Sequence, residues 1–167
     1  LDALKPRLAR SGLSNVHPAA IAHERDERVK RLAGKIDRVL VDAPCSGLGT
    51  LRRNPDLKWR QSPQALEELV AKQTAILESA ARLPKSGGRL VYATCSMLPQ
   101  ENEAIAEAFT QAHRDFEPLD AGELLAQLKV PEAASLCSGG ESGSRFVRLW
   151  PHRHQTDGFF AAVWQRK

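Results

Sequence analysis

The 167-residue sequence lacks long apolar runs, paired cysteines and a secretion signal, and each absence excludes a class of protein or site. No apolar run approaches the roughly 20 residues that a membrane-spanning helix needs, which excludes a protein that crosses a bilayer. The three cysteines, Cys45, Cys95 and Cys137, form no CxxC pair and no tight cluster with histidine, so no metal site is indicated. An odd number of cysteines without a secretion signal indicates free thiols in a reducing compartment, and we expect a cytoplasmic protein.

The composition is that of one globular domain. Hydrophobic residues make up 42% of the chain and charged residues 26%, which does not indicate disorder. The net charge of +4 permits a nucleic-acid partner without requiring one. The chain opens on a helical pattern without a start methionine, so we expect a piece of a longer protein.

The apolar pattern predicts strands that alternate with helices. Ser62 and Pro63 are typical of a helix start, because the hydroxyl caps the first turn and proline suits the first helical position. Such alternation favours an α/β fold with a parallel sheet. The four elements of this pattern are strands over 36–41 and 89–94 and helices over 62–83 and 101–113.

The two ends of the chain carry weaker patterns. We expect a helix over 1–8 that stops at Gly12, a weak strand over 15–21, a short helix over 123–128 and a Ser/Gly-rich loop over 138–144. Strand-like runs over 145–150 and 158–164, joined by the turn 151–157, predict an antiparallel hairpin. A parallel sheet with such a C-terminal hairpin is typical of the Rossmann-like methyltransferase fold.

A cysteine follows each of the two predicted parallel strands. Asp42-Ala43-Pro44-Cys45 comes after the first strand, and Thr94-Cys95-Ser96 after the second. Ligands bind at the carboxyl ends of strands in open parallel sheets, and neighbouring strands lie about 4.8 Å apart. If these strands are neighbours, as sequential strands are about two-thirds of the time, the two thiols can face one cleft.

Two thiols and a carboxylate suit chemistry on a pyrimidine ring. A thiolate adds to electron-poor carbon 6, which makes carbon 5 nucleophilic enough to accept a methyl group. A carboxylate that handles a proton on the ring nitrogen favours this addition, and a second group must remove the proton from carbon 5. Asp42, Cys45 and Cys95 are residues of suitable types.

Other interpretations stay open for single residues. A lone cysteine is more often a small buried apolar residue, and we assign Cys137 to that class. A cysteine hydrolase that uses Cys45 with His113 or His23 is another interpretation of the function, but neither histidine sits in a recognisable base motif. The segment 47–49 lacks the full GxGxxG pattern and is rejected as a phosphate-binding loop.

Two segments resemble the motifs of the Sun/nucleolar-protein family of RNA 5-methylcytosine methyltransferases. Residues 39–50 resemble its proline-cysteine motif, and residues 91–96 resemble its threonine-cysteine motif, followed by Pro99-Gln100-Glu101-Asn102-Glu103. The closing Asp157-Gly158-Phe159-Phe160 also fits. Within the family, the chain is most similar to the bacterial members that act on ribosomal RNA.

The resemblance implies an enzyme that transfers a methyl group from S-adenosylmethionine to carbon 5 of a cytosine in RNA. It implies that Cys95 is the nucleophile that attacks carbon 6 and that Cys45 assists release of the product. It also implies that Asp42 contacts the base and lies beside the cofactor.

The loop over 51–60 surrounds one aromatic residue with four cations. Arginine and lysine can neutralise phosphates, and tryptophan offers a face on which a base can stack. Trp59 could equally anchor the loop against the core. The residues that we expect to bind RNA are Arg52, Arg53, Lys58, Trp59 and Arg60.

The chain also departs from the family pattern. The first two strands, which hold most of the cofactor site, are not in the sequence, so residues 1–167 are expected to be part of a catalytic domain. Glu24 is the one weak substitute for the acidic residue expected near the adenine. The missing strands would lie between the strands at 15–21 and 36–41, so their absence exposes a sheet edge. We therefore expect weak binding of S-adenosylmethionine and self-association; a non-catalytic RNA-binding or assembly module is the alternative function.

Overall fold

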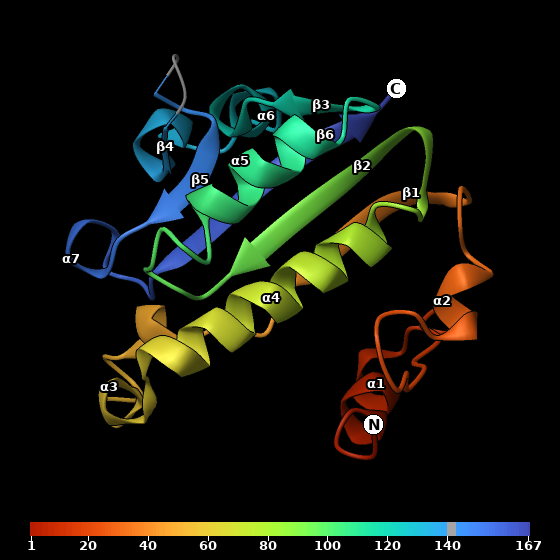
Figure 1. Ribbon diagram of the computed structural model, residues 1–167, viewed down its shortest axis with the longest axis horizontal. Coiled ribbons are helices and arrows are strands. Elements are labelled where there is room, and N and C mark those ends of the chain that lie inside the picture. The colour runs from red at the N-terminus through yellow and green to blue at the C-terminus, as the bar shows by residue number, and fades with distance from the viewer. Residues whose placement is uncertain (140–142) are drawn as a thin grey trace.

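The computed structural model, which describes residues 1–139 and 143–167, contains one sheet flanked by helices (Figure 1). In this part of the chain the sheet has the order β1-β2-β6-β5-β4, and β3 also pairs with β6. β1 and β2 run parallel, whereas the other neighbours are antiparallel. The strands are β1 (Ile36–Asp42), β2 (Pro84–Thr94), β3 (Phe116–Leu119), β4 (Cys137–Ser138), β5 (Phe146–Leu149) and β6 (Phe159–Arg166). The α/β fold with an antiparallel C-terminal hairpin is thus confirmed.

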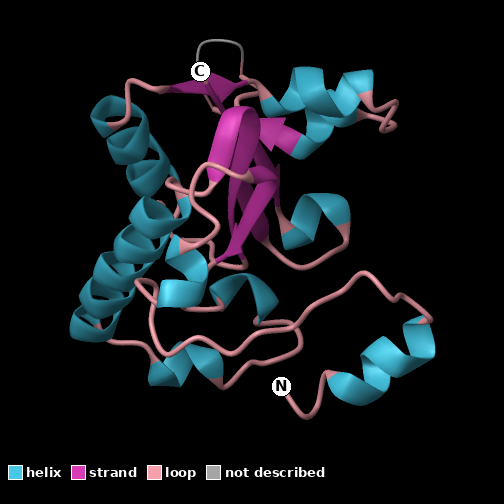
Figure 2. Cartoon of the chain, turned by 90° about the vertical axis from the view of Figure 1, so that its right-hand side faces the viewer, coloured by secondary structure: helices cyan, strands magenta, loops and turns pink. Residues whose placement is uncertain are grey.

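Two helices, α4 and α5, cross the same face of the sheet, and Figure 2 shows them along one side of the central strands. In both views α1 lies away from the sheet. The helices are α1 (Lys5–Ser11), α2 (Glu27–Lys30), α3 (Leu57–Arg60), α4 (Pro63–Ala80), α5 (Glu103–Ala112), α6 (Ala121–Gln127) and α7 (Pro151–His154), with short 3₁₀ turns η1 (Leu48–Thr50) and η2 (Ala133–Leu136). No helix in the described ranges is long and apolar enough to cross a membrane.

The core lies between the sheet and the helices α4 and α5. Leu90 and Tyr92 of β2 alternate with less buried neighbours, as a strand with one face on the core requires. Trp164 of β6 is 1% exposed and meets the Phe109 ring of α5 edge-on, with the ring centroids 4.8 Å apart. This packing holds α5 on β6 and leaves the strand ends open for a site.

The predicted starts and stops were correct where local chemistry defines them. The Ser62 hydroxyl accepts a hydrogen bond from the amide of Ala65 and so caps α4, which ends at Ala80 instead of Leu83. Gly12 ends α1 with a left-handed φ of 67°, although the helix begins at Lys5.

Several predicted boundaries were wrong. Residues 15–21 form no strand, since no neighbouring strand pairs with them, and Val16 and Ile21 are exposed. Strand β2 begins at Pro84, and its pairing with β1 is irregular between Ile36 and Arg38. Helix α5 begins two residues later than predicted, because Glu101 is fully buried in the turn that precedes it.

The C-terminal region differs in detail. Strands β3 and β4 and helix α7 were not predicted, because each is four residues or shorter and carries little periodicity. The helix predicted over 123–128 is α6, and the hairpin strands are β5 and β6. The loop predicted over 138–144 begins with a residue of β4, and residues 140–142 lie outside the described residues.

A candidate active site at two strand ends

The parallel pairing of β1 and β2 brings the two cysteine motifs together. Asp42 pairs with Ala93 in the strand register, so the strands end side by side at one edge of the sheet. Cys45 Sγ and Cys95 Sγ lie 3.4 Å apart. The expected adjacency of the strands is confirmed, and the thiols lie within contact distance of each other.

Three loops meet beneath the thiols through backbone hydrogen bonds. The amide of Gly49 donates to the carbonyl of Cys95 at 2.8 Å, and the amide of Gly158 donates to the carbonyl of Gly49 at 2.8 Å. A Cβ on Gly49 would lie 2.3 Å from the Gly158 oxygen and 2.6 Å from the Cys95 oxygen. The segment 47–49 therefore allows the backbones to approach closely, and there is no room at Gly49 for a side chain.

A buried carboxylate connects the residues that follow the two cysteines. Glu101 Oε1 accepts a hydrogen bond from the Ser46 amide at 2.8 Å and another from Gln73 Nε2 at 2.8 Å. Its Oε2 accepts from the hydroxyls of Ser46, at 2.5 Å, and Ser96. Glu101, Ser46, Gln73 and Ser96 are at most 2% exposed, so this network is shielded from solvent.

Further bonds hold the second loop. Thr94 Oγ1 donates to Asn102 Oδ1 at 2.5 Å, and Asn102 Nδ2 donates to the Ser96 carbonyl at 3.0 Å.

The sequence did not predict the polar network around Glu101. Gln73 lies between Val70 and Leu77 on the inward face of α4, and a polar residue in that stripe was the signal that could have indicated it.

The two thiols hold their protons unequally. The hydrogen bond with Cys45 lowers the pKa of Cys95 to about 7, against the opposing effects of burial and of the Asp42 and Glu101 charges. The same hydrogen bond, together with burial, raises the pKa of Cys45 well above its ordinary value. Of the two thiols, Cys95 is therefore the one that ionises more readily, and the thiolate is the nucleophilic form.

Asp42 lies exposed at the end of β1, beside a hollow of about 290 Å³. The hollow has apolar walls from β1, from the loop that follows it and from α4, including Leu40, Pro44 and Ile76. Glu24 lines the same hollow, so two carboxylates border an apolar surface. Such a lining suits a ligand with a flat apolar part and polar or cationic groups.

The basic loop after Cys45 lies next to the strand ends. Gln61 Nε2 donates to the Ser46 carbonyl at 2.9 Å, which ties the end of α3 to the first cysteine loop. The Trp59 side chain is 80% exposed, so the interpretation of Trp59 as a core anchor was wrong. Lys58 Nζ lies 4.8 Å from the centroid of this ring.

The three arginines of this loop pair with carboxylates. Arg52 Nε lies 2.6 Å from Asp157 Oδ1, and Arg53 also contacts Asp157. The bond from Arg52, followed by that from Arg53, holds the pKa of Asp157 below its usual value. Arg60 pairs with Asp56 at 2.6 Å. The arginine side chains are more than half exposed, so water screens these ion pairs and a phosphate can compete for the arginines.

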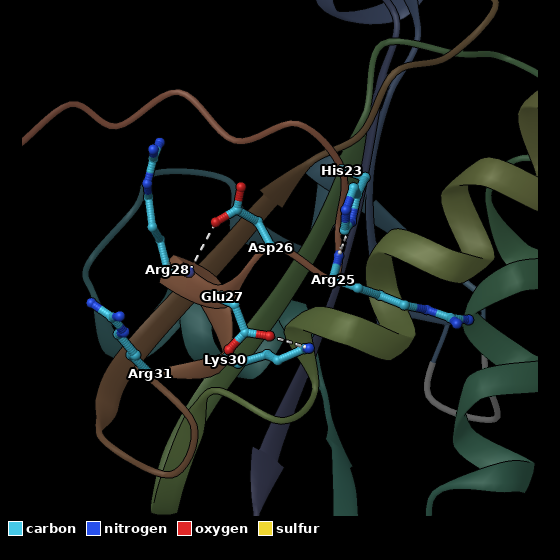
Figure 3. Close-up of a pocket in the computed structure, with 7 residues that line it drawn as sticks. All are labelled: His23, Arg25, Asp26, Glu27, Arg28, Lys30 and Arg31. Atoms are coloured by element: carbon cyan, nitrogen blue, oxygen red, sulfur yellow. Dashed lines mark hydrogen bonds and ion pairs between the residues drawn. The ribbon is translucent and has the colours of Figure 1, made fainter.

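A larger hollow of about 590 Å³ lies around α2 and carries no coherent site (Figure 3). Figure 3 shows the Arg25 side chain extending to the opposite side from Arg28 and Arg31, so these charges do not converge on one point. Lys30 Nζ is bound to Glu27 Oε1 at 2.5 Å. We assign no function to this hollow.

The histidines give Cys45 no catalytic base. His113 Nε2 lies 3.0 Å from Glu78, and its ring stacks on Phe109 near the start of β3, at the opposite end of the sheet. His23 Nδ1 accepts from the Arg25 amide at 3.1 Å. The third cysteine, Cys137, lies in β4, where burial raises its pKa. The described residues contain no cluster of side chains that could hold a metal ion.

Comparisons with known proteins agree on one family. The family model described as "16S rRNA methyltransferase RsmB/F" matches residues 1–165. The chain is 48% identical over 128 residues to a "Ribosomal RNA small subunit methyltransferase B" from Escherichia coli O1:K1, covering 77% of this chain and 26% of the relative. It is 37% identical over 170 residues to a "Probable ribosomal RNA small subunit methyltransferase B" from Bacillus subtilis, covering 98% of this chain and 35% of the relative.

Solved structures share the fold. The crystal structure of NSun6 from Pyrococcus horikoshii with SFG matches at a TM-score of 0.75 and 25% identity, covering 99% of this chain and 38% of that chain. A methyltransferase homologue from the same organism also matches at a TM-score of 0.75 and 25% identity, covering 99% of this chain and 50% of that one. The chain thus spans about a third or less of the two curated relatives above.

Proposed function

Since the chain belongs to the 16S rRNA methyltransferase RsmB/F family, we propose that the protein containing it methylates carbon 5 of a cytosine in ribosomal RNA. The observation that carries the proposal is the thiol pair, with Cys45 and Cys95 3.4 Å apart and the pKa of Cys95 lowered to about 7. A thiolate at neutral pH is what addition to a pyrimidine ring requires.

In this proposal the Cys95 thiolate attacks carbon 6 of the cytosine. A sulfur–carbon bond forms, and the electron pair of the ring double bond becomes available at carbon 5. Asp42, exposed at the same strand end, handles the proton on the ring nitrogen. After methyl transfer, Cys45, which has by then released its own proton to solvent, takes the carbon 5 proton; the electron pair of the C5–H bond re-forms the ring double bond, and the sulfur–carbon bond breaks to expel the Cys95 thiolate. Cys45, the neighbouring thiol, assists this release.

The hollow beside Asp42 fits part of S-adenosylmethionine, which supplies the methyl group when bound. Leu40 and Pro44 provide apolar surface for its adenine, while the carboxylates of Asp42 and Glu24 suit its hydroxyl groups or its cationic centre. The neighbour NSun6 was solved with SFG, an analogue of S-adenosylmethionine, which supports the assignment of this cofactor.

The loop after Cys45 binds the RNA in this proposal. Trp59 offers an exposed ring on which a base can stack, and Lys58 beside it contributes a positive charge. Phosphates displace Asp157 from Arg52 and Arg53, and Asp56 from Arg60, because these ion pairs are weak in water. The loop therefore contributes to binding more than to chemistry.

The test is covalent trapping with RNA that contains 5-azacytidine, using the protein expressed from its complete reading frame. We expect an adduct that survives denaturing electrophoresis, its loss in Cys95→Ala, and its retention in the matched control Cys137→Ala, whose cysteine lies away from the site. Adduct formation by Cys95→Ala would refute the assignment of the nucleophile. RNA binding without any adduct in the unaltered protein would favour the non-catalytic module.

A further inference from the structure

The buried Glu101 carboxylate is used by no step of the reaction above, yet it touches the residue that follows each cysteine. We propose that Glu101 is a positioning residue, which holds the Cys45 and Cys95 loops at the separation that lets one thiol hydrogen-bond the other. The importance of this separation for catalysis rests on the proposed function, whereas the geometry itself can be tested without any RNA.

The bonds to Glu101 are divided between the two loops. Oε2 receives both hydroxyls, Ser46 Oγ from the first loop and Ser96 Oγ from the second, and these hydroxyls lie 3.0 Å from each other. Oε1 receives the Ser46 amide and the side chain of Gln73. The carboxylate is therefore a bridge between residues 46 and 96, each directly bonded to a reactive cysteine.

Helix α4 fixes this bridge to the scaffold. Gln73 Nε2 donates both to Glu101 and to the Pro44 carbonyl, at 2.9 Å, just before Cys45. On the other side, the Tyr92 hydroxyl donates to the Glu101 carbonyl at 2.7 Å. Both anchors are fully buried, so the position of the carboxylate is determined by the core and not by solvent.

The shape of Glu101 matters here more than its charge. The negative charge of Glu101 opposes ionisation of Cys95, so an electrostatic role would weaken the thiolate. A glutamine can keep the bridge: its carbonyl oxygen replaces Oε1 as an acceptor from Ser46 and Gln73, and its amide group donates to the two hydroxyls, which accept as readily as they donate. Glu101→Gln should therefore preserve the thiol pair, and Glu101→Ala should release it.

The experiment measures the pH profile of Cys95 alkylation by iodoacetamide in the folded chain, with the modified peptide identified by mass spectrometry. We expect a midpoint near pH 7 in the unaltered chain and a shift toward 9.0, the ordinary thiol value, in Glu101→Ala. A shift of this size lowers the thiolate fraction at pH 7 by about 50-fold. Glu101→Gln should stay within about 0.5 pH unit of the unaltered chain.

Two further variants separate positioning from stability. Thr110→Val removes the hydroxyl that accepts from Trp164 Nε1, far from the thiols, so it should lower the melting temperature and leave the midpoint unchanged. Ser96→Ala removes one arm of the bridge and should raise the midpoint by less than Glu101→Ala does. If Glu101→Ala does not fold, Ser96→Ala and Glu101→Gln decide the question.

An unchanged midpoint of Cys95 alkylation in a folded Glu101→Ala variant, or in Ser96→Ala, would overturn the positioning role. A shift of the midpoint in Glu101→Gln as large as that in Glu101→Ala would also overturn it. The adduct assay with 5-azacytidine RNA keeps the two proposals distinct. Midpoint shifts without any adduct in the unaltered protein would refute the proposed function alone, whereas an adduct without midpoint shifts would refute positioning by Glu101 alone.

Discussion

At the scale of single residues, the properties of each cysteine depend on the other. Cys95 is partly exposed and is followed by the buried Ser96, and burial by itself raises the pKa of the Cys95 thiol. The hydrogen bond across 3.4 Å is the largest influence that lowers its pKa. Reactivity at this site is therefore a property of the pair.

Replacement of Cys45 should change the ionisation of Cys95. In Cys45→Ala the hydrogen bond is lost, so the pKa of Cys95 should rise from about 7 toward 9.0, and less thiolate should be present at neutral pH. Cys45→Ser retains a hydroxyl donor and should give an intermediate value. The pH dependence of Cys95 alkylation measures both shifts, and equal midpoints in Cys45→Ala and the unaltered chain would contradict the pairing.

A methyl group at Gly49 should destabilise the chain. The added carbon would meet backbone oxygens of Gly158 and Cys95, which are not the ends of flexible side chains. We expect Gly49→Ala to lower the free energy of unfolding by about 3 kcal/mol, as overpacking does. The control Gly34→Ala has open space but a φ of +68°, and should cost only about 1 kcal/mol of left-handed strain. Urea titration compares them, and equal losses would show that the contact at Gly49 is easily relieved.

At the scale of elements, the loop from η1 to α3 lies over the strand ends and is fastened at both sides. Gln61 ties α3 to the Cys45 loop, and the backbone hydrogen bonds of Gly49 with Cys95 and Gly158 hold η1 on the other side. The aromatic ring between these two fastenings points to solvent. An exposed ring on a fastened loop is suited to binding a ligand without a large loss of entropy.

Removal of that ring should weaken RNA binding without weakening the fold. We expect Trp59→Ala to reduce affinity for single-stranded RNA by about 1–3 kcal/mol, the usual contribution of one stacked base, because the side chain is 80% exposed. The control Leu128→Ala alters an exposed apolar residue at the C-cap of α6 and should leave affinity unchanged. Fluorescence anisotropy measures binding, and thermal melts should give the same midpoint for both variants; unchanged affinity in Trp59→Ala would exclude stacking.

At the scale of the whole molecule, the sheet is open at β1. This strand pairs with β2 and stands at the end of the sheet order within the described ranges, and Leu40 is 68% exposed. Unpaired backbone groups and apolar side chains along an edge favour pairing with a second chain.

The edge of β1 should lead to self-association of the 167-residue chain. A charge on the edge opposes such pairing, so Leu40→Lys should shift the chain toward monomer at the same concentration. Sedimentation velocity checks this, with Leu128→Lys as a control that adds the same charge at the C-cap of α6. A monomeric unaltered chain, or equal effects of both variants, would show that the edge does not drive association.

What the sequence determined by itself is local. The strand before Asp42, the capped start of α4 at Ser62 and the stop at Gly12 depend on periodicity, hydroxyl capping and glycine geometry within a few residues. The two cysteine motifs were likewise recognisable, because their positions after strands follow from the same patterns.

The tertiary structure decided the rest, since it depends on contacts between distant residues. Glu101 is 55 residues from Ser46 and 28 from Gln73, and no local pattern places these side chains together. The strand expected over 15–21 did not form, because a strand exists only with a neighbour to satisfy its backbone. The sequence thus indicated which residues are candidates for the reaction, and the parallel pairing of β1 with β2 decided how closely the two thiols meet.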